Sequence, residues 1–111
     1  MNVIKVERDG IAVFSLSGRL DAYTAPGLKA RYDRLVDQEN AQIVVDLAGV
    51  TIIDSAGLGV LVSAMKRVRQ QGGDLKLCGL RPAIAIIFDL TRLDKAFDIL
   101  TDVNEAIAAF A

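Results

Sequence analysis

Apolar positions near the start of the sequence fall in two short runs, residues 3–7 and 11–17, rich in residues that favour extended backbone. Arg8-Asp9-Gly10 lies between them, and an Asp-Gly pair flanked by such runs is a strong signal for a hairpin turn. The pattern therefore predicts a β-hairpin, with Gly18 ending its second strand.

Beyond the hairpin, the period of the apolar residues changes to that of a helix. Pro26 suits the first helical turn, and the hydroxyl of Thr24 can cap it. The apolar residues that follow recur on one helix face: Leu28, Tyr32, Leu35 and Val36. We therefore expect a helix that begins just after Thr24.

The middle of the chain repeats this order of strand and helix. Residues 43–45 are all β-branched and precede Asp46, which is typical of a strand buried on both faces. Gly72-Gly73 supplies the end of the next helix. Its apolar residues repeat at helical spacing: Leu58, Leu61, Val62, Met65 and Val68.

The last third contains shorter elements. Leu75 and Leu77 alternate with charged residues as a strand, and Pro82 begins a helix. A fifth strand is expected near residues 97–100. Asp102 can cap a final helix. That helix is expected to bury Val103, Ile107 and Phe110.

The predicted order is β-β-α-β-α-β-α-(β)-α. A hairpin ahead of alternating units indicates the α/β class, with a mixed β-sheet of four to five strands, an N-terminal hairpin and about four packed helices. The chain has 111 residues, 52% hydrophobic and 24% charged, which suits one core. We therefore expect a single domain of residues 1–111.

Charge and composition argue against several functions. The formal net charge of −1 argues against a general nucleic-acid binder, and no apolar run reaches the ~20 residues of a membrane span. No signal segment is visible, and a lone Cys78 agrees with a reducing cytoplasm, where we expect it to be a packing residue. Two basic clusters are interpreted as solvated helix faces: Lys29/Arg31/Arg34 and Lys66/Arg67/Arg69.

Histidine is absent. This removes the Ser-His-Asp and Cys-His arrangements, the commonest zinc sites and the usual proton shuttle. This closes the simplest routes to an enzyme but leaves an enzyme open. The family resemblance described below implies a binding or regulatory protein instead, with no cofactor and no metal ion.

The most informative segment is the junction between the apolar run that ends at Ile53 and the helix that follows. Asp54 and Ser55 stand at this junction, and either side chain can cap the helix. A phosphate on Ser55 would meet free N–H groups and the positive end of the helix dipole. Gly57 and Gly59 lower the helix propensity of the first turns but leave the backbone open to close approach by a partner.

Residues 52–61, Ile-Ile-Asp-Ser-Ala-Gly-Leu-Gly-Val-Leu, resemble the signature of STAS domains, in particular the bacterial anti-sigma-factor antagonists. Three further groups of segments agree in order and spacing, and the resemblance covers nearly the whole chain. They are Gly18-Arg19-Leu20-Asp21 with Thr24-Ala25-Pro26, then Asp46-Leu47-Ala48-Gly49-Val50, then Gly72-Gly73-Asp74-Leu75 with Phe88-Asp89-Leu90-Thr91-Arg92-Leu93.

The resemblance implies a partner-switching regulator of transcription in a bacterial stress response. The unphosphorylated protein would bind an anti-sigma factor with serine-kinase activity and free a sigma factor. Phosphorylation of Ser55 would release the partner, and a PP2C-type serine phosphatase would reset the protein. The residues expected to bind the partner are Asp21, Thr24, Asp54, Ser55, Ala56, Gly57, Leu58 and Gly59.

Two positions depart from the family pattern. Ala56 replaces a second hydroxyl residue that many members carry, which leaves Ser55 as the only hydroxyl between Thr51 and Ser63. Arg19 stands where an acidic residue is common, so it is expected to affect which anti-sigma factor is recognised. Asp21 is interpreted equally well as a residue of the partner site or as a turn residue.

Other functions fit less well. A receiver domain needs paired acids after its first strand, the Gly57-x-Gly59 motif lacks a third glycine at Val62, and a Ser55 hydrolase lacks a base. The alternative that stays open is a STAS docking subunit of a lipid-transport or sensory complex, in which phosphorylation plays no part. Leu58, Val62 and Met65 are assigned either to the core or to a partner groove.

Overall fold

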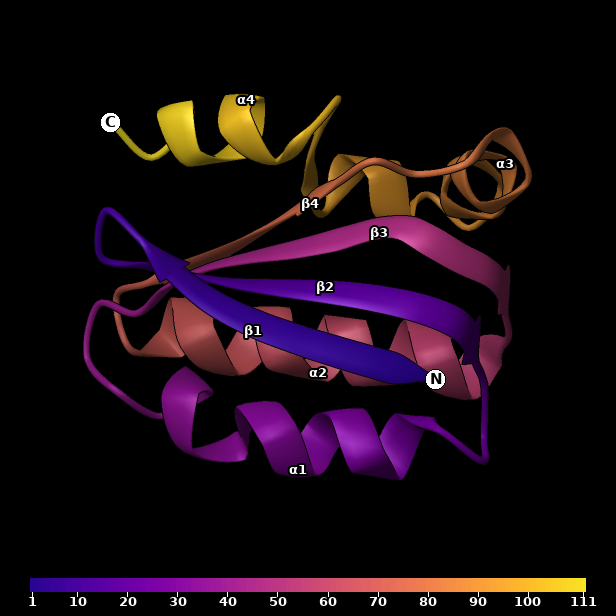
Figure 1. Cartoon of the computed structure of the whole chain (residues 1–111), viewed down its shortest axis with the longest axis horizontal. Coiled ribbons are helices and arrows are strands. Elements are labelled where there is room, and N and C mark those ends of the chain that lie inside the picture. The colour runs from indigo at the N-terminus through magenta and orange to yellow at the C-terminus, as the bar shows by residue number, and fades with distance from the viewer.

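The computed structural model describes residues 1–111 and consists of a five-stranded sheet with helices on both sides (Figure 1). In chain order its elements are β1 (Asn2–Arg8), β2 (Ile11–Leu20), α1 (Ala25–Val36), β3 (Gln42–Ile53), α2 (Ser55–Gln70), β4 (Asp74–Cys78), α3 (Pro82–Leu90), the short 3₁₀ helix η1 (Leu93–Lys95), β5 (Asp98–Leu100) and α4 (Val103–Ala108). This order and the N-terminal hairpin confirm the predicted α/β class.

The strands lie in the order β1-β2-β3-β4-β5. β1 pairs with β2 antiparallel through a turn in which Asp9 and Gly10 have φ of 54° and 79°, and the other pairs are parallel. Because parallel strands end at the same edge of a sheet, α1 and α2, which follow β2 and β3, both begin at that edge (Figure 1). The loops at this edge hold the candidate site.

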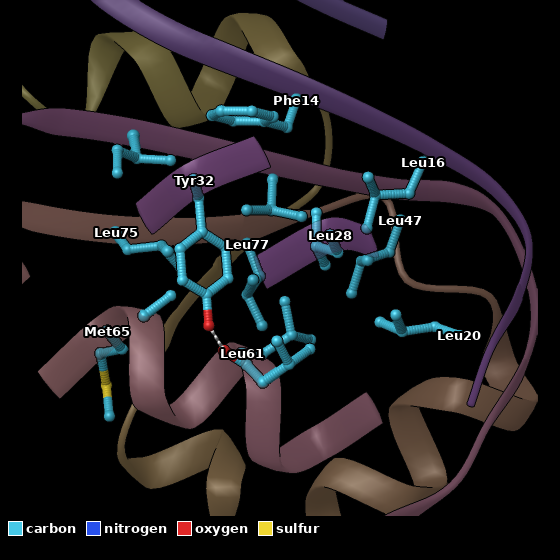
Figure 2. Packing of buried hydrophobic residues seen from close by; sticks show 14 of the residues in the cluster. Phe14, Leu16, Leu20, Leu28, Tyr32, Leu47, Leu61, Met65, Leu75 and Leu77 are labelled. Carbon is cyan, nitrogen blue, oxygen red and sulfur yellow. Dashed lines mark hydrogen bonds between the residues drawn. The ribbon is translucent and has the colours of Figure 1, made fainter. Parts of the chain in front are cut away.

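The main core lies between the sheet and the pair α1 and α2. Figure 2 shows side chains from both helices, such as Leu28 and Leu61, meeting those of the strands, such as Phe14. Tyr32 belongs to this core, where its hydroxyl donates a hydrogen bond of 2.8 Å to the Val60 carbonyl of α2. Burial raises the pKa of that phenol above its ordinary value.

A smaller core lies on the opposite face of the sheet, under α4. It contains Cys78, which is a buried packing residue as predicted, and burial raises the pKa of its thiol to about 12. Asp102 caps α4 by accepting a hydrogen bond from the Glu105 N–H at 2.8 Å, which confirms the predicted cap. The apolar residues predicted to face inward on this helix are partly buried: Val103, Ile107 and Phe110.

Two strand boundaries differ from the prediction. Gly18 does not end β2, which continues to Leu20. The backbone of Gly18 is left-handed, with φ of 96°, and an irregular step in the pairing with β3 follows it. β3 also extends far beyond the predicted residues 43–45, since its second half pairs with β2 alone. These extensions place Leu20 opposite Ile53, directly before the candidate site.

The basic clusters lie on helix faces, as interpreted from the sequence, and several of their side chains are paired there. Arg67 of α2 contacts Asp33 of α1 at 2.6 Å and Asp37, just past the end of α1, at 2.7 Å. Lys29 contacts Asp33 one helical turn away, at 3.0 Å. The hydrogen bond from Arg67 is the main cause that lowers the pKa of Asp33. The Arg67 pairs therefore join α1 to α2.

We expect this link to be sensitive to acid. A lowered folded-state pKa means that Asp33 stabilises the fold above the ordinary aspartate pKa of 3.8 and loses this effect as the pH falls through the lowered value. Arg67→Met should therefore have a lower free energy of unfolding than the wild type at about pH 7. The difference between the two free energies should be smaller at about pH 2.5. Urea denaturation at both pH values measures it.

The matched control is Arg34→Met, because Arg34 is an exposed cation of α1 without an ion pair in the chain. Its unfolding free energy should follow the wild type at both pH values. A gap for Arg67→Met that does not change with pH would contradict the role given to Asp33.

The start of α2 packs directly on the end of β2. A Cβ added to Gly57 would collide with the Leu20 carbonyl oxygen and lie 2.9 Å from Cγ1 of Ile53, whereas one added to Gly59 would meet nothing within 4 Å. We expect Gly57→Ala to destabilise the protein by about 1–3 kcal/mol through overpacking. Gly59→Ala should stabilise it by up to about 1 kcal/mol through helix propensity. Urea midpoints that are equal for the two variants would refute this contrast.

Candidate functional site

The site lies where β2 and β3 end side by side and α2 begins. Ser55 is the first residue of α2, and its side chain is exposed. Asp54 is the capping residue: its Oδ1 accepts a hydrogen bond of 2.9 Å from the Gly57 N–H. Of the two predicted caps, Asp54 is therefore the one that caps α2, and the Ser55 hydroxyl takes no part in capping.

The second carboxylate oxygen of Asp54 reaches a different loop. It accepts a hydrogen bond of 3.1 Å from the N–H of Ala22, in the turn between β2 and α1. The backbone N–H of Asp54 also donates to the Leu20 carbonyl at 3.3 Å. Asp54 thus connects the start of α2 to the β2–α1 turn and holds both beside Ser55.

The backbone at the start of α2 favours negative charge. Asp54 accepts from the N–H of Gly57 through its side chain and from that of Leu58 through its carbonyl, at 2.9 Å in each case. The N–H groups of Ser55 and Ala56 come before the first intrahelical bond. A phosphate on Ser55 would therefore stand next to unused donors and the positive end of the helix dipole.

Asp21 is buried in the β2–α1 turn and organises it. Its Oδ2 accepts from Nε of Arg19 at 3.1 Å, and its Oδ1 accepts from the N–H groups of Tyr23 and Thr24 at 3.0 and 3.2 Å. The hydrogen bond from Arg19, supported by those amides, holds the pKa of this carboxyl below its usual value. Of the two interpretations of Asp21, the turn residue is confirmed. Its place in a partner site stays a prediction.

Thr24 stands at the capping position of α1 but does not cap it, so that prediction was wrong. Its hydroxyl accepts from the N–H of Asp21 at 2.9 Å and donates to the carbonyl of Arg19 at 2.8 Å. These two bonds close the turn and occupy the oxygen that a cap would need. Thr24 therefore fixes the turn beside Ser55.

The remaining predicted partner residues divide between the inside and the surface. Gly57 is buried, and the group that closely approaches its backbone is this chain's own Leu20 carbonyl. Met65 is buried in the core, whereas Leu58 and Val62 are partly buried against it. The place of Leu58 in a partner site stays a prediction. Ala56 and Gly59, in contrast, line a surface groove.

This groove, which we call the α1–α2 groove, has a volume of about 340 Å³ and begins at Ala56, next to Ser55. Most of its lining is apolar or small, with Lys29 as its one charged side chain. The lining residues are Ala22, Ala25, Pro26, Lys29, Tyr32, Ala56, Gly59, Val60 and Ser63. The groove therefore offers a largely apolar surface that includes Ala56, the residue after Ser55.

Sequence reasoning missed the α1 half of this surface. Ala22, Ala25 and Pro26 carry little periodic signal, because small side chains do not mark a helix face. It also missed Tyr23, which is 94% exposed in the turn that Asp54 binds. One signal was available: Tyr23 falls outside the apolar spacing of the helix that follows. Exposed aromatic side chains are frequent anchors of protein interfaces.

The described residues contain no group of three or more His, Cys, Asp or Glu side chains placed to hold a metal ion. None of the helices has the length and apolar character that a bilayer crossing requires.

Comparison with known proteins agrees with this geometry. The family model for the STAS domain matches residues 2–106. The chain is 38% identical to the anti-sigma-B factor antagonist of Bacillus subtilis, over 86% of each chain. It is 37% identical to that of Listeria monocytogenes, over 84% of this chain and 81% of the relative.

A solved structure gives the same result. The crystal structure of an anti-sigma factor antagonist from Mycobacterium paratuberculosis superimposes with a TM-score of 0.87 at 29% identity, covering 97% of this chain and 92% of that one. The fold, the order of the elements and the similarity over nearly the whole length lead to one assignment. This chain belongs to the STAS domain family.

Proposed function

We propose that this chain is an anti-sigma factor antagonist that binds an anti-sigma factor through Ser55 and the α1–α2 groove, and that phosphorylation of Ser55 breaks the complex. The names of the relatives, at 37% and 38% identity, support the antagonist function. The partners would be an anti-sigma factor with serine-kinase activity and a PP2C-type phosphatase. The protein would act in the cytoplasm as a regulator and not as an enzyme.

The proposal rests on the different roles of two adjacent residues. Asp54 supplies the cap and both loop contacts, and Ser55 is exposed. A kinase could therefore modify Ser55 without removing a hydrogen bond that holds the fold. The unused amides at the start of α2 would stabilise the phosphate within the folded protein.

The charge of the turn explains why a phosphate would expel a partner. Phosphorylation adds about −1.5 to −2 charges, directly beside the carboxylate of Asp54. Arg19, the cation of this turn, is already paired with Asp21. A partner that fits the neutral hydroxyl would face repulsion and an uncompensated desolvation cost. A loss of about 3 kcal/mol weakens binding by roughly 150-fold.

The α1–α2 groove would supply contact area that does not depend on charge. Interfaces gain most of their affinity from a few side chains, chiefly aromatic residues and Arg, that fill pockets on the other protein. Small residues such as Ala25 and Gly59 leave room for such an anchor within reach of Ser55. The antagonist names of the relatives favour this function over a docking subunit that does not switch.

Phosphorylation can be tested with the proposed serine-kinase anti-sigma factor, isolated from the native host by its binding to this chain. Incubation with this kinase and ATP should add one phosphate at Ser55, detected by intact-mass and peptide mass spectrometry. Ser55→Ala should bind the kinase but stay unmodified, and Ser55→Asp should bind at least tenfold more weakly, a difference of about 1.4 kcal/mol. Thr51→Ala, which removes an exposed hydroxyl four residues earlier, is the control and should be phosphorylated normally. Modification that persists in Ser55→Ala would refute the site.

The groove can be tested by filling it. Gly59→Leu projects a side chain into the α1–α2 groove from a position with open space, so the fold is retained. We expect at least tenfold weaker binding of the unphosphorylated protein to the same anti-sigma factor by isothermal titration calorimetry, about 1.4 kcal/mol.

Ala85→Leu is the control, because Ala85 is an exposed small residue of α3, which lies apart from the groove and from the predicted partner residues. It should bind as the wild type does. An equal loss in both variants, or in neither, would remove the groove from the interface.

A further inference from the structure

β1 lies at an edge of the sheet, and one side of its backbone has no partner strand in the chain. It is outermost in the strand order and pairs with β2 alone (Figure 1). It is also long: β1 has seven residues, all exposed except the partly buried Val3, whereas β5 at the opposite edge has three. An open strand edge presents a row of unpaired N–H and C=O groups, which is a template for another strand.

The hairpin determines which backbone groups of β1 face outward. Arg8 and Ile11 flank the Asp9-Gly10 turn, and a turn of this kind is closed by a bond from the fourth residue to the carbonyl of the first, so Arg8 faces β2. The bonding side alternates along an antiparallel strand. The residues whose backbone groups face outward are therefore Val3, Lys5 and Glu7. The Val3 carbonyl agrees, because it accepts a hydrogen bond of 3.3 Å from Nη2 of Arg31, in α1, and not from β2.

The charges along this edge are divided by sign. Lys5 and Arg31 lie at the N-terminal half of β1, and Glu7 and Asp9 lie at its hairpin end. All four side chains are exposed, and none is in an ion pair within the chain. Nζ of Lys5 lies over the Phe14 ring, on the face that α1 and α2 cover, and alternation places Glu7 on the same face. An edge with a cationic half and an anionic half is complementary to its own reverse.

We propose that β1 pairs antiparallel with β1 of a second copy of this chain, about a twofold axis at Val6, so that the two sheets become one. Lys5 of each copy then lies opposite Glu7 of the other. The outward backbone groups of these two residues bond across the edge, and their side chains form pairs of opposite charge. Such an isologous contact is the commonest symmetry of protein dimers.

The charges select this register among those that the backbone allows. An axis at Lys5 would place the two Lys5 side chains directly opposite each other, and like charges in that position are destabilising. An axis at Ile4 would place Lys5 opposite Val3, and Glu7 opposite a residue that precedes the strand. A shift by a single residue would set outward groups opposite inward ones and form no ladder. Only the axis at Val6 pairs Lys5 with Glu7.

The cations of α1 fit the same axis. Asp9 of the second copy lies opposite Val3, whose carbonyl Arg31 binds, so this carboxylate is brought to the Arg31 guanidinium. α1 runs in the same direction as β1 (Figure 1). From the rise per residue of helix and strand, Arg34 is about 5 Å from the axis along β1, at a level between Glu7 and Asp9 of the second copy. The two Arg34 residues are about 11 Å apart in this direction. Arg34 therefore faces anions of the second copy.

The other face of the sheet supplies an apolar centre for the contact. Val6, 45% exposed, meets its equivalent at the axis, and Ile4, 64% exposed, lies opposite Arg8 of the second copy. Nη2 of Arg8 donates to Oδ1 of Asn104 at 2.9 Å, which holds the guanidinium toward α4 of its own chain. The two Arg8 residues are about 13 Å apart along the strands. The contact shares no residue with the α1–α2 groove.

Sedimentation velocity of the full chain from about 1 to 500 μM tests the dimer, because one strand pair buries less than a standard interface and micromolar association is expected. The wild type should shift from monomer to dimer over this range. Glu7→Lys should raise the dissociation constant at least tenfold, because Lys5 then faces a lysine. Asp89→Lys makes the same change of charge on the exposed surface of α3 and is the control, which should dimerise normally. Circular dichroism checks that each variant is folded.

Restoring the charge pair tests the orientation. The double variant Lys5→Glu/Glu7→Lys should dimerise like the wild type, because each copy then presents the reversed pair. A wild type that stays monomeric at every concentration would overturn the proposal. So would a Glu7→Lys variant that dimerises normally, an Asp89→Lys variant that does not, or a double variant without recovery.

Cysteine cross-linking tests the register. Residues at the axis lie about 4.5 Å apart between Cα atoms, within the range of a disulfide. Val6→Cys should therefore form a covalent dimer under mild oxidation, detected on a non-reducing gel. Ile4→Cys is the control on the same face: its equivalents lie about 13 Å apart, so it should not cross-link. Cys78 is buried and leaves the added thiol as the reactive one. Equal cross-linking of the two variants, or none in Val6→Cys, would contradict the axis at Val6.

Discussion

The carboxylate of Asp54 holds the candidate site together. One oxygen accepts from the N–H of Gly57 and the other from the N–H of Ala22, so a single side chain joins the start of α2 to the turn between β2 and α1. Both of these segments follow parallel strands, and the sheet alone would not determine their relative position. Because the bonds are charge-assisted, they are stronger than those between neutral groups. The surface around Ser55 is thus already formed in the unbound protein.

The residues that hold the site in place are different from the residue proposed to be modified. Asp21 and Thr24 use their polar atoms to close the β2–α1 turn, and Gly57 lets α2 approach Leu20. Ser55 is exposed beside these fixed groups. A modification at this position can therefore change the charge of the surface by about two units while the scaffold beneath it is kept. That combination is what a reversible switch needs.

Much of the fold could be predicted because helices and hairpins have local signals. The apolar spacing from Leu28 to Val36 and the Asp9-Gly10 turn each depend on neighbours in sequence. The long second half of β3 could not be predicted, since it is held by β2, whose residues are about thirty positions away. The α1–α2 groove could not be predicted for a different reason. It is formed by the absence of side chains at positions such as Gly59, and an absence leaves no periodicity to detect.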